Sequence, residues 1–86
     1  MHVAIKTRFF EKVCDVTGGD TTTAVHCLSD IARPLRLMDA QTWDAVDDLL
    51  SEGLLEPALV SGVQVRLTAT GAQRCIEQQR RASPVA

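Results

Sequence analysis

The chain has 86 residues with a formal net charge of −2, and 45% of its residues are hydrophobic while 23% are charged. This length suits one core, so we expect a single domain at residues 1–82 with a flexible tail at 83–86, and the composition excludes disordered and collagen-like classes. No apolar run reaches the roughly 20 residues that cross a bilayer, and the N-terminus lacks the apolar stretch of a signal peptide, so we expect a cytoplasmic protein without membrane contact.

Apolar residues at helical spacing begin the chain. They predict a first helix over residues 3–16, with a stripe of Ile5, Phe9, Val13 and Val16 flanked by Phe10 and Cys14. A Gly-Gly pair ends this helix, and Asp20 or Thr21 can cap a second helix that begins near Thr22. We expect the second helix to stop near Arg33, because Pro34 disfavours an α conformation in the residue before it.

A third helix is predicted from the capping residue Asp39 through Glu52, and Gly53 supplies the stop signal after it. Its buried stripe is expected to consist of Trp43, Val46, Leu49 and Leu50. The opposite face presents polar side chains to solvent, centred on Gln41, Asp44, Asp48 and Glu52, with Asp47 at its edge.

After the third helix the hydrophobic period changes from that of a helix to that of a strand. The second strand of a β-hairpin is predicted where apolar and polar residues alternate, its apolar members being Val63, Val65 and Leu67. The first strand lies within residues 54–60, and Ser61-Gly62 suits the turn. Pro57 indicates that the first strand is an edge strand or contains a bulge. A two-residue turn would set Glu56 opposite Leu67, so the sequence leaves the register of the hairpin open.

A last helix, capped by Thr68 or Thr70, completes the predicted fold with a stripe of Ala72, Cys75, Ile76 and Gln79. The fold class is therefore α+β and mostly helical: three helices, a two-stranded hairpin and a C-terminal helix. The cysteines are odd in number and contain no C-x-x-C pair; they are Cys14, Cys27 and Cys75. This pattern does not match a disulfide framework or a zinc site, and we expect reduced thiols in the core.

Five segments, in this order of elements, resemble the winged helix-turn-helix family over about half of the chain. They are Leu28-Ser29-Asp30-Ile31-Ala32 (L-x-x-I-A), Leu35 with Leu37, Gln41-Thr42-Trp43, Leu49-Leu50-Ser51-Glu52-Gly53-Leu54-Leu55-Glu56 (L-x-x-x-G-L-L), and Leu67-Thr68-Ala69-Thr70-Gly71 (L-T-x-x-G). The resemblance implies that the third helix is a recognition helix and the hairpin a wing. Members of that family usually read the DNA major groove with this helix, so the resemblance implies transcription regulation.

The predicted recognition helix has the wrong charge for DNA. Residues 37–65 carry six acidic and no basic side chains, whereas the segments before and after them are net positive. Affinity for DNA comes chiefly from Lys and Arg at phosphates, and a carboxylate held near a phosphate costs on the order of 1 kcal/mol. We interpret the face formed by Gln41, Asp44, Asp48 and Glu52 as a binding face for a basic surface of another protein. A merely solvated helix face and DNA readout through this helix are the alternatives.

Most of the basic residues lie outside this helix and the hairpin loop, and two groups stand out on the first and last helices: Lys6, Arg8, Lys12, Arg74, Arg80 and Arg81. A nucleic-acid surface displaced to these helices is a further alternative, although such surfaces are usually more basic or carry exposed aromatic rings. Phe9 and Phe10 give the first helix more apolar surface than one small core needs. We therefore expect these two side chains to form a contact in a homodimer.

Catalytic and metal sites find little support in the sequence. His26 and Cys27 are neighbours in a predicted helix and so point about 100° apart, which does not suit a nucleophile and its base. No cysteine or histidine pair has the short spacing of metal ligands, and no phosphate-binding glycine loop is present. We expect no enzyme, no cofactor and no metal, but a regulatory or adaptor module that works through protein–protein contacts. The alternative is a winged helix-turn-helix DNA-binding transcription regulator.

Overall fold

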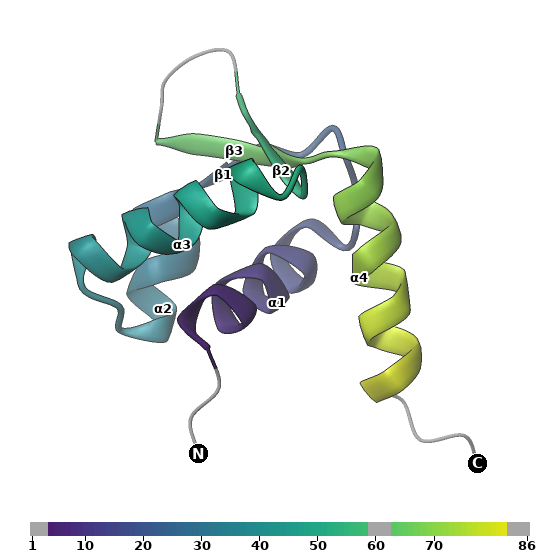
Figure 1. Ribbon diagram of the computed structural model, residues 1–86, viewed down its shortest axis with the longest axis horizontal. Helices are drawn as coiled ribbons and strands as arrows, with labels where there is room; N and C mark the ends of the chain where they lie inside the picture. Colours follow the sequence, from purple (N-terminus) through teal and green to yellow (C-terminus); the bar gives the residue numbers. More distant parts are fainter. Residues whose placement is uncertain (1–3, 59–62, 83–86) are drawn as a thin grey trace.

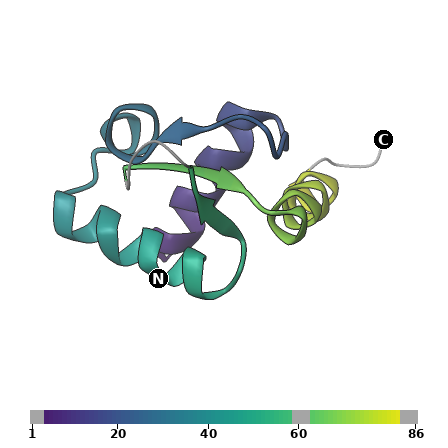
Figure 2. The same ribbon diagram turned by 90° about the horizontal axis from the view of Figure 1, so that it is seen from above.

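The computed structural model describes residues 4–58 and 63–82, which form a mostly helical α+β arrangement with one antiparallel sheet (Figure 1). In chain order the elements are α1 (Ile5–Thr17), β1 (Val25–His26), the π-helical segment η1 (Cys27–Ala32), α2 (Arg33–Leu35), α3 (Asp39–Ser51), β2 (Leu55–Pro57), β3 (Gln64–Leu67) and α4 (Ala69–Ala82). The sheet lies over one side of α1, and α4 stands at one end of the molecule (Figures 1 and 2). The predicted tail at 83–86 lies outside the described residues.

The first helix, α1, agrees with the sequence prediction and ends at the Gly-Gly pair. Gly18 takes a left-handed conformation with φ 64°, and its N–H donates to the Cys14 carbonyl at 2.8 Å. Glycine suits this position because side chains with a Cβ rarely adopt a positive φ. The apolar stripe is shorter than predicted, since Val16 is 43% exposed.

The predicted second helix begins later than expected, and its start near Thr22 is wrong. Asp20 Oδ1 accepts hydrogen bonds from the Thr22 hydroxyl at 2.7 Å and from the Thr22 N–H at 2.8 Å, which form a local turn and, the hydroxyl most, lower the pKa of the Asp20 carboxyl. Helical structure starts only after β1, where the side chain of His26 forms the cap. His26 Nδ1 accepts hydrogen bonds from the N–H groups of Leu28 and Ser29 at 3.2 and 3.0 Å.

The helix also continues beyond the point where Pro34 was expected to stop it. Pro34 lies within α2, which runs to Leu35, and Arg36 then leaves the helix with a left-handed φ of 58°. The wide turns of η1 precede it, and the Leu37 N–H reaches back to the Ala32 carbonyl at 3.0 Å. A widened helix separates the proline ring from the carbonyl with which it would clash in a regular α-helix. The stop near Arg33 is therefore corrected to a stop after Leu35.

The predicted hairpin is confirmed, and a third strand, which was not predicted, joins it. β3 lies between β1 and β2, and both pairings are antiparallel. Glu56 pairs with Arg66 and not with Leu67, so the register differs by one residue from the one that a two-residue turn would give. Arg66 Nε donates to Glu56 Oε1 at 2.8 Å across this pair. β2 is an edge strand, as Pro57 predicted, whereas the predicted turn at 61–62 lies outside the described residues.

Phe9 and Phe10 lie inside the core of one chain. Their exposed fractions are 0% and 2%, and they belong to one cluster with buried side chains of η1, α3 and the sheet, among them Ile31, Leu49, Val65 and Leu67. Full burial of such a side chain contributes about 1.5–3 kcal/mol to the stability of the fold. The prediction that these two residues form a dimer contact is therefore corrected, because the chain itself covers both rings. A homodimer stays a prediction without assigned contact residues.

A disulfide bond between Cys14 and Cys75 joins α1 to α4, which corrects the expectation of three reduced thiols. The two residues lie 61 positions apart in the sequence, with Cα atoms 5.5 Å apart, within the range that a disulfide spans. No sequence spacing links such distant cysteines, because only the packing of α4 against α1 brings them together. Cys27 is a free and buried thiol, and burial raises its pKa to about 11.

Candidate functional site

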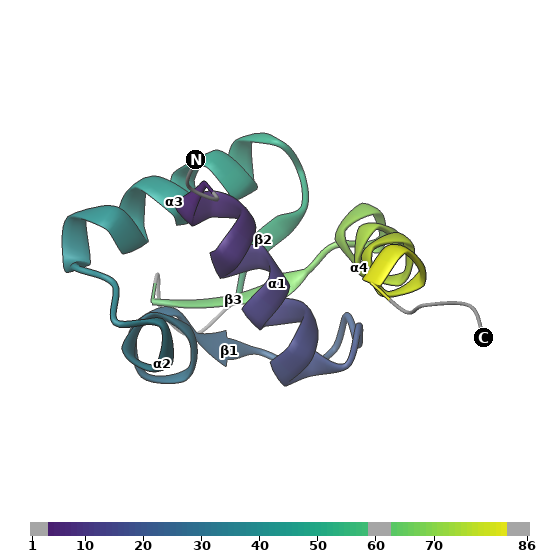
Figure 3. The same cartoon turned by 90° about the horizontal axis from the view of Figure 1, so that it is seen from below.

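The outer face of α3 is set by the packing of its inner face. The buried side chains of this helix are Thr42, Ala45, Val46 and Leu49. Trp43 and Leu50, which were predicted for the buried stripe, are only half-buried, so the helix is turned slightly from its predicted orientation. On the opposite side Asp44, Asp47 and Asp48 are exposed, and the view from below shows this helix along one edge of the molecule (Figure 3).

The N-terminus of α3 uses Gln41, one of the four residues of the predicted binding face. The Met38 N–H donates to Gln41 Oε1 at 2.9 Å, and the Thr42 hydroxyl donates to the Met38 carbonyl at 3.0 Å. Met38 is thus the capping residue in place of the predicted Asp39. Because Gln41 is half-buried and its oxygen already accepts this hydrogen bond, the main role of its side chain is to cap the N-terminus of α3.

Glu52, another residue of the predicted face, is already paired within the chain. Its Oε2 forms an ion pair with Lys6 Nζ, which α1 contributes from 46 positions earlier. The hydrogen bond to Glu52 raises the pKa of Lys6 against an opposing effect of desolvation, and the charges of Glu52 and Asp48 raise it further. Lys6 lies outside residues 37–65, so the absence of basic side chains in that segment gave no indication of this pair.

Asp44 and Asp48 are the two predicted residues that stay exposed without such a pair among the described contacts. They lie one helical turn apart and border the same surface hollow, which has a volume of about 360 Å³ and lies between α3 and the start of α1. Its lining residues are Ala4, Ile5, Lys6, Gln41, Asp44, Ala45 and Asp48. The hollow can receive a cationic side chain between two carboxylates, although Lys6 already offsets part of their charge.

His26 and Cys27, which were weighed as a nucleophile and base, have structural roles. The His26 ring caps η1, and the Cys27 thiol is fully buried with a raised pKa, which leaves little of the reactive thiolate at neutral pH. Among residues 4–58 and 63–82, no group of three or more His, Cys, Asp and Glu side chains is arranged to hold a metal ion.

Comparisons with known protein families, with curated proteins and with solved structures find no match to this chain. In the part of the chain that the structure describes, no helix has the length and apolar character needed to cross a membrane. The candidate site consequently rests on the geometry of α3 and its neighbours alone.

Proposed function

We propose that the chain is a non-enzymatic winged-helix module that acts in the cytoplasm through protein–protein contacts. The observation that carries the proposal is the outward face of α3, where Asp44, Asp47 and Asp48 are exposed and two of them border one hollow. The partner offers a Lys- or Arg-rich surface to these carboxylates. Gln41 and Glu52 lie beside them, but their side chains have the intramolecular partners described above.

The winged-helix part of the proposal is supported by the order of elements around α3. One helical unit, η1 with α2, precedes α3, the hairpin of β2 and β3 follows it, and α4 ends the described chain. This is the order that the sequence resemblance implies. β1 adds a third strand to the hairpin without changing that order.

The charge of α3 supports a basic protein partner over DNA. Residues 37–65 contain no Lys or Arg that can neutralise phosphates. In protein–DNA complexes, half or more of the hydrogen bonds go to the sugar–phosphate backbone of the DNA. Carboxylates that face a basic protein surface increase the association rate instead. This attraction fades with salt, because the Debye length falls from about 10 Å at 0.1 M to about 3 Å at 1 M.

A winged helix-turn-helix transcription regulator is the second candidate, and Arg33 and Arg36 favour it. Both side chains are exposed and border a hollow of about 380 Å³ at the turn that leads into α3. Phosphate contacts from these residues would bring the start of α3 to DNA. The carboxylates further along the same helix would then face the phosphates, which is why we rank this function second.

The double substitution Asp44→Asn with Asp48→Asn tests the first proposal. We expect association with the native partner, isolated from the host by affinity capture, to slow by roughly threefold or more at low salt, with an unchanged melting temperature. The matched control is Glu11→Gln with Asp15→Asn, which removes the same charge from exposed positions of α1. Equal slowing in both variants would indicate an effect of net charge, and unchanged rates in the first would leave α3 as a solvated surface.

Retention on double-stranded DNA and on heparin separates the two candidate functions. We expect the parent protein to elute at low salt from both columns, because α3 repels polyanions. Salt-sensitive retention on DNA that Arg33→Gln with Arg36→Gln abolishes would favour the transcription regulator and contradict our first proposal.

A further inference from the structure

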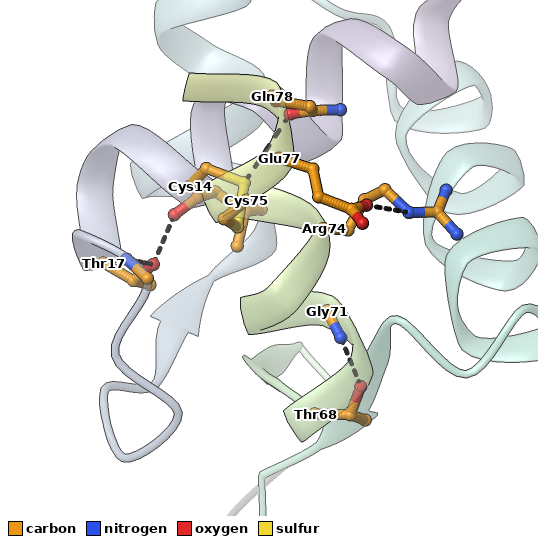
Figure 4. The surroundings of a disulfide bond; sticks show 10 residues. Cys14, Thr17, Thr68, Gly71, Arg74, Cys75, Glu77 and Gln78 are labelled. Atoms are coloured by element: carbon orange, nitrogen blue, oxygen red, sulfur yellow. Dashed lines mark hydrogen bonds and ion pairs between the residues drawn. A yellow bond between two sulfur atoms is a disulfide. The ribbon is translucent and has the colours of Figure 1, made fainter. Parts of the chain in front are cut away.

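Two attachments hold α4 to the rest of the protein. At its start Thr68 Oγ1 accepts a hydrogen bond from the Gly71 N–H at 2.9 Å, which confirms the predicted cap, and the Thr68 N–H donates to the Leu54 carbonyl at 3.1 Å. One helical turn after Gly71, the disulfide ties Cys75 to Cys14 of α1 (Figure 4). The first attachment is a set of hydrogen bonds, and the second is covalent.

Apart from the close packing of Gly71, in its first turn, against Leu54 and Leu67, few contacts in the described structure hold α4 in place. Of the fifteen side chains that form the core cluster among the described residues, only Cys75 comes from this helix. Ile76 was predicted to be buried but is 44% exposed, and Gln79 is exposed as well. The ion pair between Arg74 and Glu77 lies within α4 and links it to no other element. The core of α1, η1, α3 and the sheet is therefore nearly complete without α4.

We propose that Cys14 and Cys75 form a reversible thiol–disulfide site, which in its closed form holds α4 on α1 and which a dithiol reductant opens to release α4. A 14-residue helix is only marginally stable alone in water, so the released helix also loses structure. Release pivots at the Thr68 attachment and uncovers the side of α1 that carries Cys14. Since the bond joins a peripheral helix to the core, its opening does not require the core to unfold.

A surface hollow gives a reductant its route to the bond. It has a volume of about 290 Å³, and both bonded cysteines line it together with Glu11, Asp15, Gln78 and Gln79. The cysteines themselves are only 3% and 1% exposed, so a bulky surface cannot reach the sulfur atoms without some movement of α4. Glu11 and Asp15 contribute two carboxylates to the lining of this hollow, and these repel an anionic thiolate more than a reductant of lower charge.

The reaction is ordinary thiol–disulfide exchange with a dithiol. One thiolate of the reductant attacks a sulfur of the Cys14–Cys75 bond, forms a mixed disulfide with it and expels the other cysteine as a thiolate. The second thiol of the reductant, as its thiolate, then displaces the first cysteine and closes a disulfide within the reductant. Two electrons pass to the protein, the two cysteine thiolates take up two protons, and the reductant is oxidised.

The cytoplasmic location proposed above is consistent with a reversible Cys14–Cys75 bond. In a reducing cytoplasm, disulfides are rare and are mostly transient, catalytic or redox-sensing, whereas structural disulfides are typical of oxidising compartments. Cys27 takes no part, because its thiol is buried elsewhere in the core.

Hydrogen exchange of the full chain, with and without dithiothreitol, tests the proposal. We expect reduction to raise the thiol count after denaturation from one to three, since only Cys27 is free in the oxidised form. Amides of α4 should then exchange roughly tenfold faster or more, while those of α3 keep their protection, and reoxidation should restore α4. Trypsin should cut after Arg74 in the reduced protein faster than in the oxidised one. Cys14→Ala with Cys75→Ala should reproduce the reduced state without reductant.

Three results would overturn the proposal. Resistance of the folded protein to excess dithiothreitol, with the thiol count still at one, would make the bond irreversible under native conditions. Unchanged protection of α4 after complete reduction would show that hydrogen bonds and packing suffice to hold it. Loss of protection in α3 together with α4 would make the bond a staple of the whole fold. Because the wild-type chain is the main reagent, these results do not depend on whether the double alanine variant folds.

Reduction rates test the route through the hollow. Glu11→Gln with Asp15→Asn should accelerate the first exchange with the anionic tripeptide glutathione, which forms a mixed disulfide and frees one cysteine thiolate, roughly threefold or more. The first exchange with dithiothreitol should accelerate less, because dithiothreitol carries less negative charge. Asp44→Asn with Asp48→Asn removes the same charge away from the bond and should change neither rate appreciably. If glutathione attacks the Cys14–Cys75 bond at the same rate in the parent protein and in the Glu11/Asp15 variant, this route is overturned.

Discussion

Replacing Gly71 by alanine should destabilise the fold although it improves the helix. Gly71 lies in the first turn of α4, buried against residue 54. A Cβ at this position would lie 2.0 Å from the Leu54 carbonyl oxygen, 3.0 Å from its carbon and 3.2 Å from a Leu67 methyl. The obstacle is mainly backbone, which cannot rotate away as a flexible side chain would. The start of α4 must therefore move away from Leu54.

Two effects of opposite sign decide the magnitude. Alanine in place of glycine favours a helix by up to about 1 kcal/mol. Overpacking costs about 1–3 kcal/mol, and movement away from Leu54 weakens the hydrogen bond from the Thr68 N–H to the Leu54 carbonyl, which contributes about 1 kcal/mol. The clash outweighs the helix preference, and we expect a net loss of about 2 kcal/mol, or roughly 8–16 °C in melting temperature for a domain of this size.

Thermal unfolding followed by circular dichroism, without reductant, measures the effect. Thr70→Ala is the control, since Thr70 is exposed in the same turn and its substitution gains helix preference without meeting a neighbour. We expect Thr70→Ala to melt at or slightly above the parent temperature. If Gly71→Ala melts as high as the parent, the close approach between α4 and residue 54 is not what selects glycine here.

Three further outcomes follow from groups described above. Cys14→Ala with Cys75→Ala should lower the free energy of unfolding, relative to the oxidised parent, by at most about 4 kcal/mol, which is the loss of chain entropy expected for cysteines 61 positions apart. Urea unfolding would measure this change, and no loss would mean that the bond does not form. Glu52→Gln should lower the pKa of Lys6 toward its usual 10.5, as an NMR titration would detect, and an unchanged titration would contradict the ion pair. Because the pKa of Lys6 is raised in the folded state, the pair stabilises the fold fully below about pH 10.5, and this stabilisation is lost as the pH rises through the folded-state pKa. Cys27, with its pKa near 11, should resist iodoacetamide at about pH 8 until the protein unfolds, and rapid modification of the native state would contradict its burial.

Local patterns predicted the elements whose structure is locally determined. The helix stripes and the glycine stop located α1 and α3 within one or two residues, and strand alternation located β3. β1 could not be found in this way, because two residues show no period and become a strand only by pairing with Gln64 and Val65. Pro34 predicted a stop because a proline disrupts a regular α-helix, but the segment η1 before it is a π-helix, whose turns are wider than those of an α-helix.

The candidate site shows the same division. A helical wheel sufficed to predict that Asp44 and Asp48 face solvent, because that depends on α3 alone. It could not show that Glu52 meets Lys6, or that Cys14 meets Cys75, because each of these pairs depends on how distant helices pack. The burial of both Phe9 and Phe10 was missed for a related reason: the size of the shared core became evident only with α3 and the sheet in place.

The central position of β3 in the sheet has a consequence for how the chain folds during synthesis. β3 pairs with β1 from the first third of the chain, so neither the sheet nor the core beneath it can close until Leu67 has left the ribosome. Such non-local pairing favours one late, cooperative folding step over growth from the N-terminus. The bond from Cys14 can form only later still, because its partner Cys75 belongs to α4, which emerges after β3. A nascent chain that stops before β3 should therefore remain unfolded, with Cys14 exposed as a free thiol, and oxidation should come last in folding.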